Sequence, residues 1–278
     1  MEKIRVITDS TATLPSEIKN RYNILQAPFY FEFGGKIHKD GIDIEIDEVY
    51  KHINENTKFK AYPPKPEDFL NIFNLCSEDK IICITISSTF SGCYKNALIA
   101  KDFIKDKEIE IIDSLTAGSG EGLLTYLTLR YIEEALPFKD LISKVKETAL
   151  KIKTIVYIDT LKYVYRTGRI PKTLSNFGSF LSVKPIVSLS LGKIRPLSVV
   201  TSREKGFERI VEVLKKDNAQ DILICMDIDV KEEEKRFFVE KMREIFENIK
   251  IFFVEFTPIM GYAVGSGVFG VSYIGRML

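Results

Sequence analysis

The chain has no tryptophan, only two histidines among its 278 residues, and four cysteines that form no Cys-x-x-Cys pair. Neither His38 nor His52 has a metal-ligand spacing, so histidine acid–base catalysis and a zinc site are not expected. No apolar run is long enough to span a bilayer, and no signal-peptide pattern precedes the first strand. We therefore expect a cytoplasmic protein with buried, reduced thiols, no metal, no cofactor and no stable membrane insertion.

The charges nearly cancel, because 40 Lys and Arg residues oppose 39 Asp and Glu residues. A net charge of +1 gives no general attraction to nucleic acid, and we expect no nucleic-acid partner. One region has a large excess of basic residues. Such an excess favours binding to an acidic partner or to phosphates, unless the side chains are simply solvated. Its nine basic residues oppose one acid, Glu204, a local balance of 9 − 1 = +8; they are Lys162, Arg166, Arg169, Lys172, Lys184, Lys193, Arg195, Arg203 and Lys205.

Four apolar runs have the composition of strands that are buried on both faces, as parallel strands usually are. They begin at Ile4, Ile81, Ile109 and Ile155, and each is closed by Asp, Ser or Thr. Parallel strands place their carboxyl ends at one edge of a sheet, where open α/β sheets bind ligands. Any single residue of this kind can equally be the cap of a helix or a turn. The four ends together favour a ring of small polar groups at one edge.

The predicted centre of the site is the stretch from Ile81 to Ala97, IICITISSTFSGCYKNA. Its first half predicts a buried strand, and a helix is expected to begin at about Gly92 with Ser91 as its N-cap. Such a junction leaves serine hydroxyls and free backbone N–H groups at the end of a strand. Because helix N-termini favour anions, this loop is where we expect a ligand to bind.

Two α/β domains are predicted, because the composition changes after residue 160. Residues 1–160 are expected to form a mainly parallel sheet flanked by helices, which the strand from Thr154 closes. Residues 161–278 are expected to form a second α/β domain with the basic surface. The proline-rich segment 58–69, KFKAYPPKPEDF, predicts a rigid loop that is either a plain connector or a crossing to the second domain.

Several ordered motifs resemble the DegV family of bacterial fatty-acid-binding proteins, whose better-known members hand a bound fatty acid to an acyl kinase. The resemblance spans nearly the whole chain. The matching residues are Ile7-Thr8-Asp9-Ser10-Thr11 with Leu14-Pro15, Pro64-Lys65-Pro66-Glu67-Asp68-Phe69, Ser87-Ser88-Thr89-Phe90-Ser91-Gly92, Ile112-Asp113-Ser114, Thr167-Gly168-Arg169-Ile170, Lys184-Pro185-Ile186 with Gly192-Lys193-Ile194, and Gly265, Gly267 and Gly270.

The resemblance implies a second domain that covers the lipid, with the acyl chain buried in a tunnel between the two domains. It implies that Ser91 binds the carboxylate. The residues that would line or support this site are Ser10, Ser88, Gly92, Ser114 and Arg169.

Two positions depart from the family pattern. Ala61 stands where the family usually has a threonine, and Ala263 stands where a histidine normally lies near the head group. Each lost donor costs a buried carboxylate roughly 1–3 kcal/mol. Burial contributes about 0.8 kcal/mol per methylene, or about 12 kcal/mol for roughly fifteen of them. We therefore expect that lipid binding persists, while head-group selectivity or presentation to a kinase changes.

The leading hypothesis is a non-catalytic carrier of a long-chain fatty acid or similar single-chain lipid, with an acyl kinase docking through the basic region Lys162 to Lys205. One alternative is a phosphotransferase or hydrolase that uses Asp9, Asp113 or Asp159 at the strand ends. Against it, these motifs contain neither the second aspartate of a metal-dependent phosphatase nor a His or Lys base. A third possibility is a regulatory protein that docks on another protein through its basic stretch.

Overall fold

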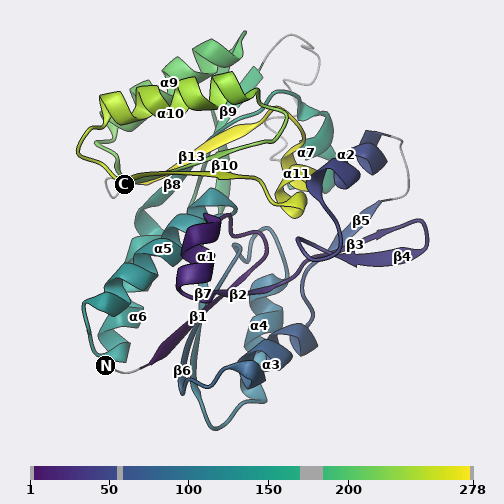
Figure 1. The fold of residues 1–278 in the computed structure, drawn as a ribbon, viewed down its shortest axis with the longest axis vertical. Helices are drawn as coiled ribbons and strands as arrows, with labels where there is room; N and C mark the ends of the chain where they lie inside the picture. Colours follow the sequence, from purple (N-terminus) through teal and green to yellow (C-terminus); the bar gives the residue numbers. More distant parts are fainter. Residues whose placement is uncertain (1–2, 55–58, 170–183, 276–278) are drawn as a thin grey trace.

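The computed structural model describes residues 3–54, 59–169 and 184–275, without the side chains of Asn54, Lys162, Tyr165 and Arg166. Ile170, Lys172 and the first residue of the segment 58–69 therefore lie outside the described residues. Across the described part of the chain, two main sheets and the helices around them form successive layers, with a third, small sheet beside them (Figure 1).

The first sheet contains four parallel strands in the order β2 (Leu25–Ala27), β1 (Ile4–Asp9), β6 (Lys80–Thr85) and β7 (Glu108–Asp113). Its central strands β1 and β6 are mainly apolar and pair parallel with their neighbours, which confirms the predicted parallel sheet. Four helices lie around this sheet, namely α1 (Ser16–Arg21), α3 (Pro66–Leu75), α4 (Cys93–Asp102) and α6 (Phe138–Lys151). Helices α3 and α4 pack against each other.

The second sheet has six strands, and among its described neighbours only β11 and β12 pair parallel. Helices α9 (Arg203–Lys216) and α10 (Glu232–Ile245) cover its outer face (Figure 1). Its strand order is β10 (Lys193–Val200), β9 (Lys184–Ser190), β8 (Ile152–Tyr157), β13 (Phe269–Ile274), β11 (Gln220–Met226) and β12 (Ile251–Glu255).

Strand β8 was expected to close the first domain, yet it pairs antiparallel with β9 and β13. Residues 152–157 therefore belong to the second sheet, and the strand from Thr154 does not complete the first sheet. The expectation that four apolar runs end at one edge of one sheet is therefore wrong for the run from Ile155. The division of the chain into domains at residue 160 stays a prediction, because sheet membership changes before that residue.

Helix α5 (Ser119–Glu133) contacts strands of both sheets. Every residue from Ser119 to Leu129 is buried, as expected for a helix with no solvent-facing side. The N-terminus of α5 thus lies deep between the sheets, and this geometry creates the site described below.

A small antiparallel sheet with the order β4 (Lys36–Lys39), β3 (Tyr30–Phe33) and β5 (Lys60–Tyr62) stands beside the first sheet. The segment 58–69 is therefore partly a strand, because β5 pairs with β3. Helix α2 (Ile46–Asn54) follows this hairpin and packs against α11 (Pro258–Val264) near the end of the chain. Helix α2 is thus, besides α5, a part of the N-terminal half that contacts the C-terminal half.

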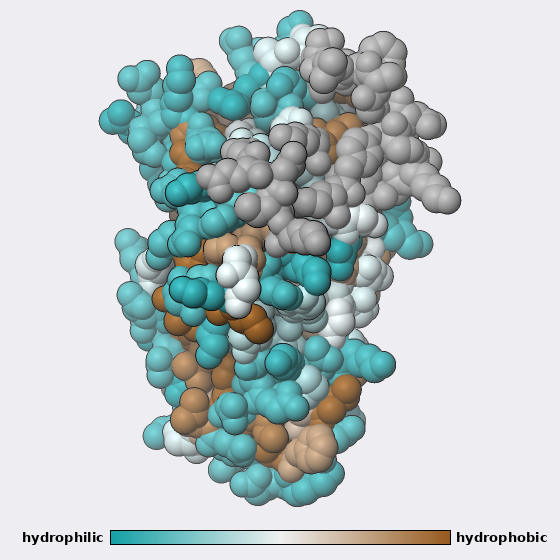
Figure 2. All heavy atoms as spheres, turned by 90° about the vertical axis from the view of Figure 1, so that its right-hand side faces the viewer, coloured by the Kyte–Doolittle hydropathy of each residue, from teal (hydrophilic) through white to brown (hydrophobic). Residues whose placement is uncertain are grey.

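Exposed apolar side chains occur at several places on the surface of the described chain. Figure 2 shows brown residues low on the face that it draws, separated by hydrophilic ones. Leu75 at the end of α3 and Phe103 just after α4 are among the most exposed apolar residues. In the described part of the chain, no helix has the length and apolar character needed to cross a membrane.

Candidate functional site

A cavity of about 220 Å³ lies between the two sheets. The loop after β6, the start of α5, strands β8, β9 and β13, and helices α7 (Leu161–Thr167) and α11 contribute to its wall. Most lining residues are aliphatic, aromatic or glycine. A cavity of this kind suits a largely hydrocarbon ligand with a small polar group. The lining side chains that carry an oxygen or nitrogen atom are Thr11, Ser91, Ser119, Thr154, Thr167, Arg169 and Tyr262.

Four of the predicted site residues line this cavity, namely Ser91, Arg169, Ala61 and Ala263. The Ser91 Oγ accepts a hydrogen bond from the Cys93 backbone N–H at 3.3 Å, at the first residue of α4. The N-cap is Gly92, so the helix begins one residue later than expected. Arg169 Nε donates to the backbone O of Phe90 at 3.2 Å, which holds its guanidinium beside the Ser91 loop.

The other predicted site residues do not line the cavity. The Ser10 Oγ accepts from the Phe29 N–H at 2.9 Å, and Ser114 Oγ donates to the Thr116 O at 3.2 Å. Ser88 is exposed, and its backbone N–H donates to the Asp113 carboxylate at 3.2 Å. These three residues organise neighbouring loops, and a ligand role for them and for Gly92 stays a prediction.

Several lining residues were not singled out as site residues from the sequence. Ser119 follows a glycine at the start of α5, and Thr11 belongs to the first strand-end motif, so both had a local signal. Thr154 lies inside β8, and nothing in its neighbours marks it. Helix α11 contributes Ile259 and Met260 from the Gly-rich tail.

The carboxylate of Asp9 is fully buried and joins β1 to both ends of the Ser91 loop. Its Oδ2 accepts from the Ile86 N–H at 2.7 Å and from the Cys93 Sγ at 3.0 Å. Its Oδ1 accepts from the Thr11 N–H at 2.9 Å and from the Thr11 Oγ1 at 2.5 Å. Burial raises the pKa of Asp9, and these hydrogen bonds oppose the rise. Asp9 therefore fixes the loop rather than facing the cavity.

Glu121 lies on the other side of Thr11 and is also fully buried, with 2.6 Å between its Oε2 and the Thr11 Oγ1. Burial raises the pKa of Glu121 well above its usual range, and the charge of Asp9 raises it further. The single hydroxyl hydrogen of Thr11 cannot serve both acids. Asp9 receives more donors, so we assign the negative charge to Asp9 and a neutral, donating carboxyl to Glu121.

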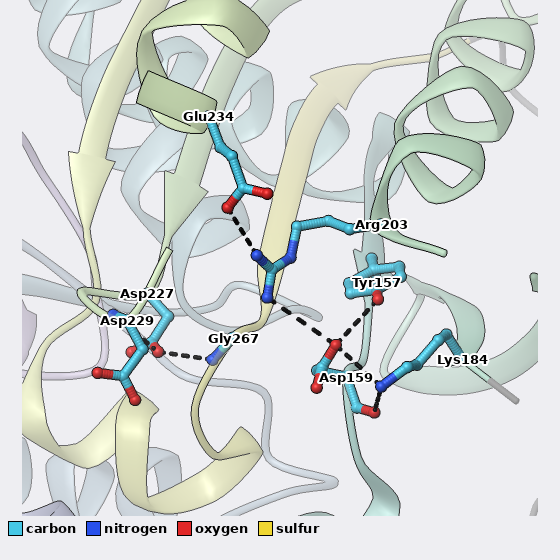
Figure 3. Close-up of polar contacts among 8 residues, drawn as sticks. All are labelled: Tyr157, Asp159, Lys184, Arg203, Asp227, Asp229, Glu234 and Gly267. Atoms are coloured by element: carbon cyan, nitrogen blue, oxygen red, sulfur yellow. Dashed lines mark hydrogen bonds and ion pairs between the residues drawn. The ribbon is translucent and has the colours of Figure 1, made fainter. Parts of the chain in front are cut away.

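A second polar cluster joins elements of the second sheet (Figure 3). Asp159 accepts from the Tyr157 hydroxyl at 3.0 Å and forms ion pairs with Lys184 at 3.1 Å and Arg203 at 3.9 Å. Arg203 also pairs with Glu234 at 2.7 Å. Two cations of the basic stretch are thus neutralised by neighbouring acids.

Two buried acids join the N-terminal half to the end of the chain, one at α11 and one just after it. The Asp40 Oδ1 accepts from the Ile259 N–H at 2.9 Å, and the Tyr50 hydroxyl donates to Asp227. Asp227 also accepts from the Gly267 N–H at 2.7 Å (Figure 3). Burial raises the pKa of Asp40 to about 7. The hydrogen bond from Ile259 to Asp40 holds a lining residue of α11 in the wall of the cavity.

Three residues of the basic stretch lie around a second hollow. Arg169, Lys193 and Arg195 line it together with Thr89 and Phe90. Phe90 and Arg169 also line the main cavity, so the two hollows are adjacent. Within residues 3–54, 59–169 and 184–275, no carboxylate forms an ion pair with these three cations, and no group of His, Cys, Asp and Glu side chains could hold a metal ion.

The sequence of the chain matches a known protein family. A family model described as "Uncharacterised protein, DegV family" matches residues 3–276. A DegV domain-containing protein of Caldanaerobacter subterraneus is 35% identical over 217 residues, which are 77% of this chain and 78% of that protein.

Solved structures share the fold. A stearic acid-binding protein from Eubacterium ventriosum has a TM-score of 0.88 and 22% identity, with 99% of each chain covered. The Fatty Acid Kinase (Fak) B3 protein of Streptococcus pneumoniae, loaded with linoleic acid, has a TM-score of 0.86 and 20% identity, with 99% of this chain and 100% of that chain covered. The family model spans almost the entire sequence, and the chain therefore belongs to the DegV family.

Proposed function

We propose that the protein binds a long-chain fatty acid or a similar single-chain lipid in the cavity and carries it without chemical change. The observation on which this rests is the nearly apolar cavity, with Ser91 and Arg169 as polar groups in its wall. An alkyl chain gains about 0.8 kcal/mol per buried methylene, which makes such a wall favourable for it. Two solved relatives that share the fold bind stearic and linoleic acid. The cytoplasm is the compartment that we propose for this carriage.

The head group is proposed to lie at the Ser91 loop. Ala61 and Ala263 line the same cavity but cannot donate a side-chain hydrogen bond. Arg169 is the only charged residue among the lining residues that the structure describes. We therefore assign the carboxylate to the Ser91 hydroxyl and the Arg169 guanidinium, because a buried anion needs both donors and an opposite charge.

The strand-end aspartates favour carriage over phosphotransfer or hydrolysis. Asp9 is fully buried, and Asp113 accepts from the backbone N–H groups of Ser88 and Leu115. Asp159 is engaged by Lys184 and Arg203. None of the three aspartates is among the residues that line the cavity.

Ser91→Ala is expected to weaken fatty-acid binding by about ten- to a hundredfold, because the carboxylate loses a charge-assisted hydrogen bond. Delipidated protein titrated with a fluorescent fatty acid measures the change. Ser88→Ala is the matched control, since Ser88 lies in the same loop but does not line the cavity, and we expect no change in affinity. Equal losses in both variants would contradict the assignment of Ser91. If mass spectrometry found no acyl species on the purified protein and no uptake of added fatty acid, carriage itself would be wrong.

We further propose that Arg169, Lys193 and Arg195 form part of the docking surface for an acyl kinase. Lys193 and Arg195 are exposed, unpaired by any acid of the described chain, and adjacent to the cavity. Complementary charge at the rim of an interface accelerates association and fixes its orientation.

The paired change Lys193→Glu and Arg195→Glu is expected to slow fatty-acid phosphorylation by the kinase at least about tenfold. Acyl binding should stay unchanged. Lys215→Glu with Lys216→Glu, at the exposed end of α9, is the matched control. Phosphorylation at the wild-type rate with the first pair would show that the kinase docks elsewhere, and a general regulatory role would then be tested by capture of other proteins.

A further inference from the structure

Four buried hydroxyls form a continuous chain in the wall of the cavity. Thr116 Oγ1 lies 3.2 Å from Thr154 Oγ1, which lies 2.8 Å from Ser272 Oγ, and Ser272 Oγ lies 2.7 Å from Ser119 Oγ. Their residues are between 0% and 4% exposed. Thr154 and Ser272 are opposite each other on β8 and β13, whereas Thr116 and Ser119 flank the start of α5. The chain of hydroxyls thus joins the second sheet to the buried helix.

Two of the four hydroxyl residues lie in the wall of the cavity. Ser119 and Thr154 both line the cavity, and Gly118 and Gly270 lie beside them in the same wall. Gly120 permits the close approach of helix and strand, since a Cβ there would lie 2.3 Å from Thr116 Oγ1 and 2.6 Å from Thr154 Oγ1. The hydroxyls therefore interrupt an otherwise apolar wall, at a position distinct from the Ser91 loop.

The four hydroxyls cannot satisfy all of their own hydrogen-bond donors. Four hydroxyls have four hydrogens, but only three contacts link them. One of the four hydrogens therefore needs an acceptor elsewhere. Among the residues that the structure describes, none of the four hydroxyls has an acceptor outside the chain of hydroxyls. A buried hydroxyl without an acceptor is unfavourable, and a plain alkyl chain against Ser119 cannot provide one.

The surroundings favour a neutral oxygen as that acceptor rather than a carboxylate. Thr11 lines the same cavity, and Asp9 and Glu121 lie directly behind it. Arg169, the charged residue of the described lining, belongs to the Ser91 loop region, where its Nε binds Phe90. A second anion near Ser119 would thus be close to buried acids and have no cation beside it.

We propose that Ser119 and Thr154 recognise an oxygen substituent within the acyl chain, so that the protein prefers a hydroxylated or keto fatty acid over the unsubstituted one. This inference rests on the proposed function. A secondary alcohol fits best, because it accepts the remaining hydrogen from Ser119 or Thr154 and donates to a lone pair of either hydroxyl. The carboxylate of the same ligand occupies the Ser91 loop.

Competition binding to delipidated full-length protein tests the proposal, with stearate against a positional series of monohydroxystearates. At least one isomer is expected to bind about tenfold more tightly than stearate. In Thr154→Val and in Ser119→Ala this preference should fall to about unity, while stearate binds as tightly as before or more tightly. Thr128→Val is the control, because this buried hydroxyl donates to the Leu124 O and does not line the cavity.

Each result decides the proposal. Equal affinity for stearate and every isomer overturns it and leaves fatty-acid carriage intact. A preference that survives in both Ser119→Ala and Thr154→Val also overturns it, and two separate variants keep the test valid if one of them fails to fold. Failure of both stearate and the hydroxystearates to bind would instead overturn the proposed function.

Discussion

Replacing Gly122 with alanine is expected to cost the native state about 3 kcal/mol or more, although alanine is the better helix former by about 1 kcal/mol. A Cβ at Gly122 would lie 1.9 Å from the backbone O of Thr13 and 2.9 Å from its carbonyl carbon. The Thr13 N–H donates to the Gly118 O at 3.3 Å, which fixes the loop after β1 against α5. Both partners are main chain, so no side-chain rotation can relieve the clash.

The urea unfolding midpoint measures this loss, and Gly92→Ala is the control. Gly92 has a φ of −73° and no heavy atom within 4 Å of an added Cβ, so alanine there loses only the N-cap preference, about 1 kcal/mol or less. A midpoint for Gly122→Ala at or above that of the wild type would mean that α5 can move away from the loop. The close packing at the start of α5 would then be wrong.

The strand-end pattern was sufficient to predict the parallel sheet and the loop at its centre. Buried parallel strands are apolar on both faces, so β1, β6 and β7 are recognisable without their partners. The same pattern did not identify the sheet to which β8 belongs. Its Ile-rich run resembles those of the first sheet, but its partners β9 and β13 come later in the chain. Pairing with distant strands leaves no mark in the local sequence.

The candidate site was predictable only where a residue's local role and its cavity position coincide. Ser91 follows a strand and precedes a helix, and it lines the cavity. Ser10 and Ser114 have similar local positions, yet their hydroxyls bond to backbone groups, as short polar side chains at turns often do. Thr154 lies within a strand, and its place in the cavity wall depends on the packing of α5 against β8, which the local sequence does not show.

Asp9→Ala is expected to destabilise the protein by about 3 kcal/mol or more, because it leaves several buried donors without an acceptor. The Ile86 and Thr11 N–H groups and the Cys93 thiol all donate to this carboxylate. Part of this loss of stability is offset, because the substitution also removes the cost of burying an acid, which is what raises the pKa of Asp9. Asp113→Ala is the matched control, since Asp113 is partly exposed and water can replace it at the Ser88 and Leu115 N–H groups. Chemical unfolding of the two variants should therefore show the larger loss for Asp9→Ala.

The same substitution is expected to weaken fatty-acid binding at least as much as Ser91→Ala. Asp9 touches residues 86 and 93, at the two ends of the loop that presents Ser91, and it does not line the cavity. Its effect on a ligand must therefore pass through the position of Ser91. Two residues that act through one contact are not additive, so the double variant should bind about as weakly as Asp9→Ala alone. Additive losses in this double-mutant cycle, measured on folded protein at low temperature, would show that Asp9 reaches the ligand by another route.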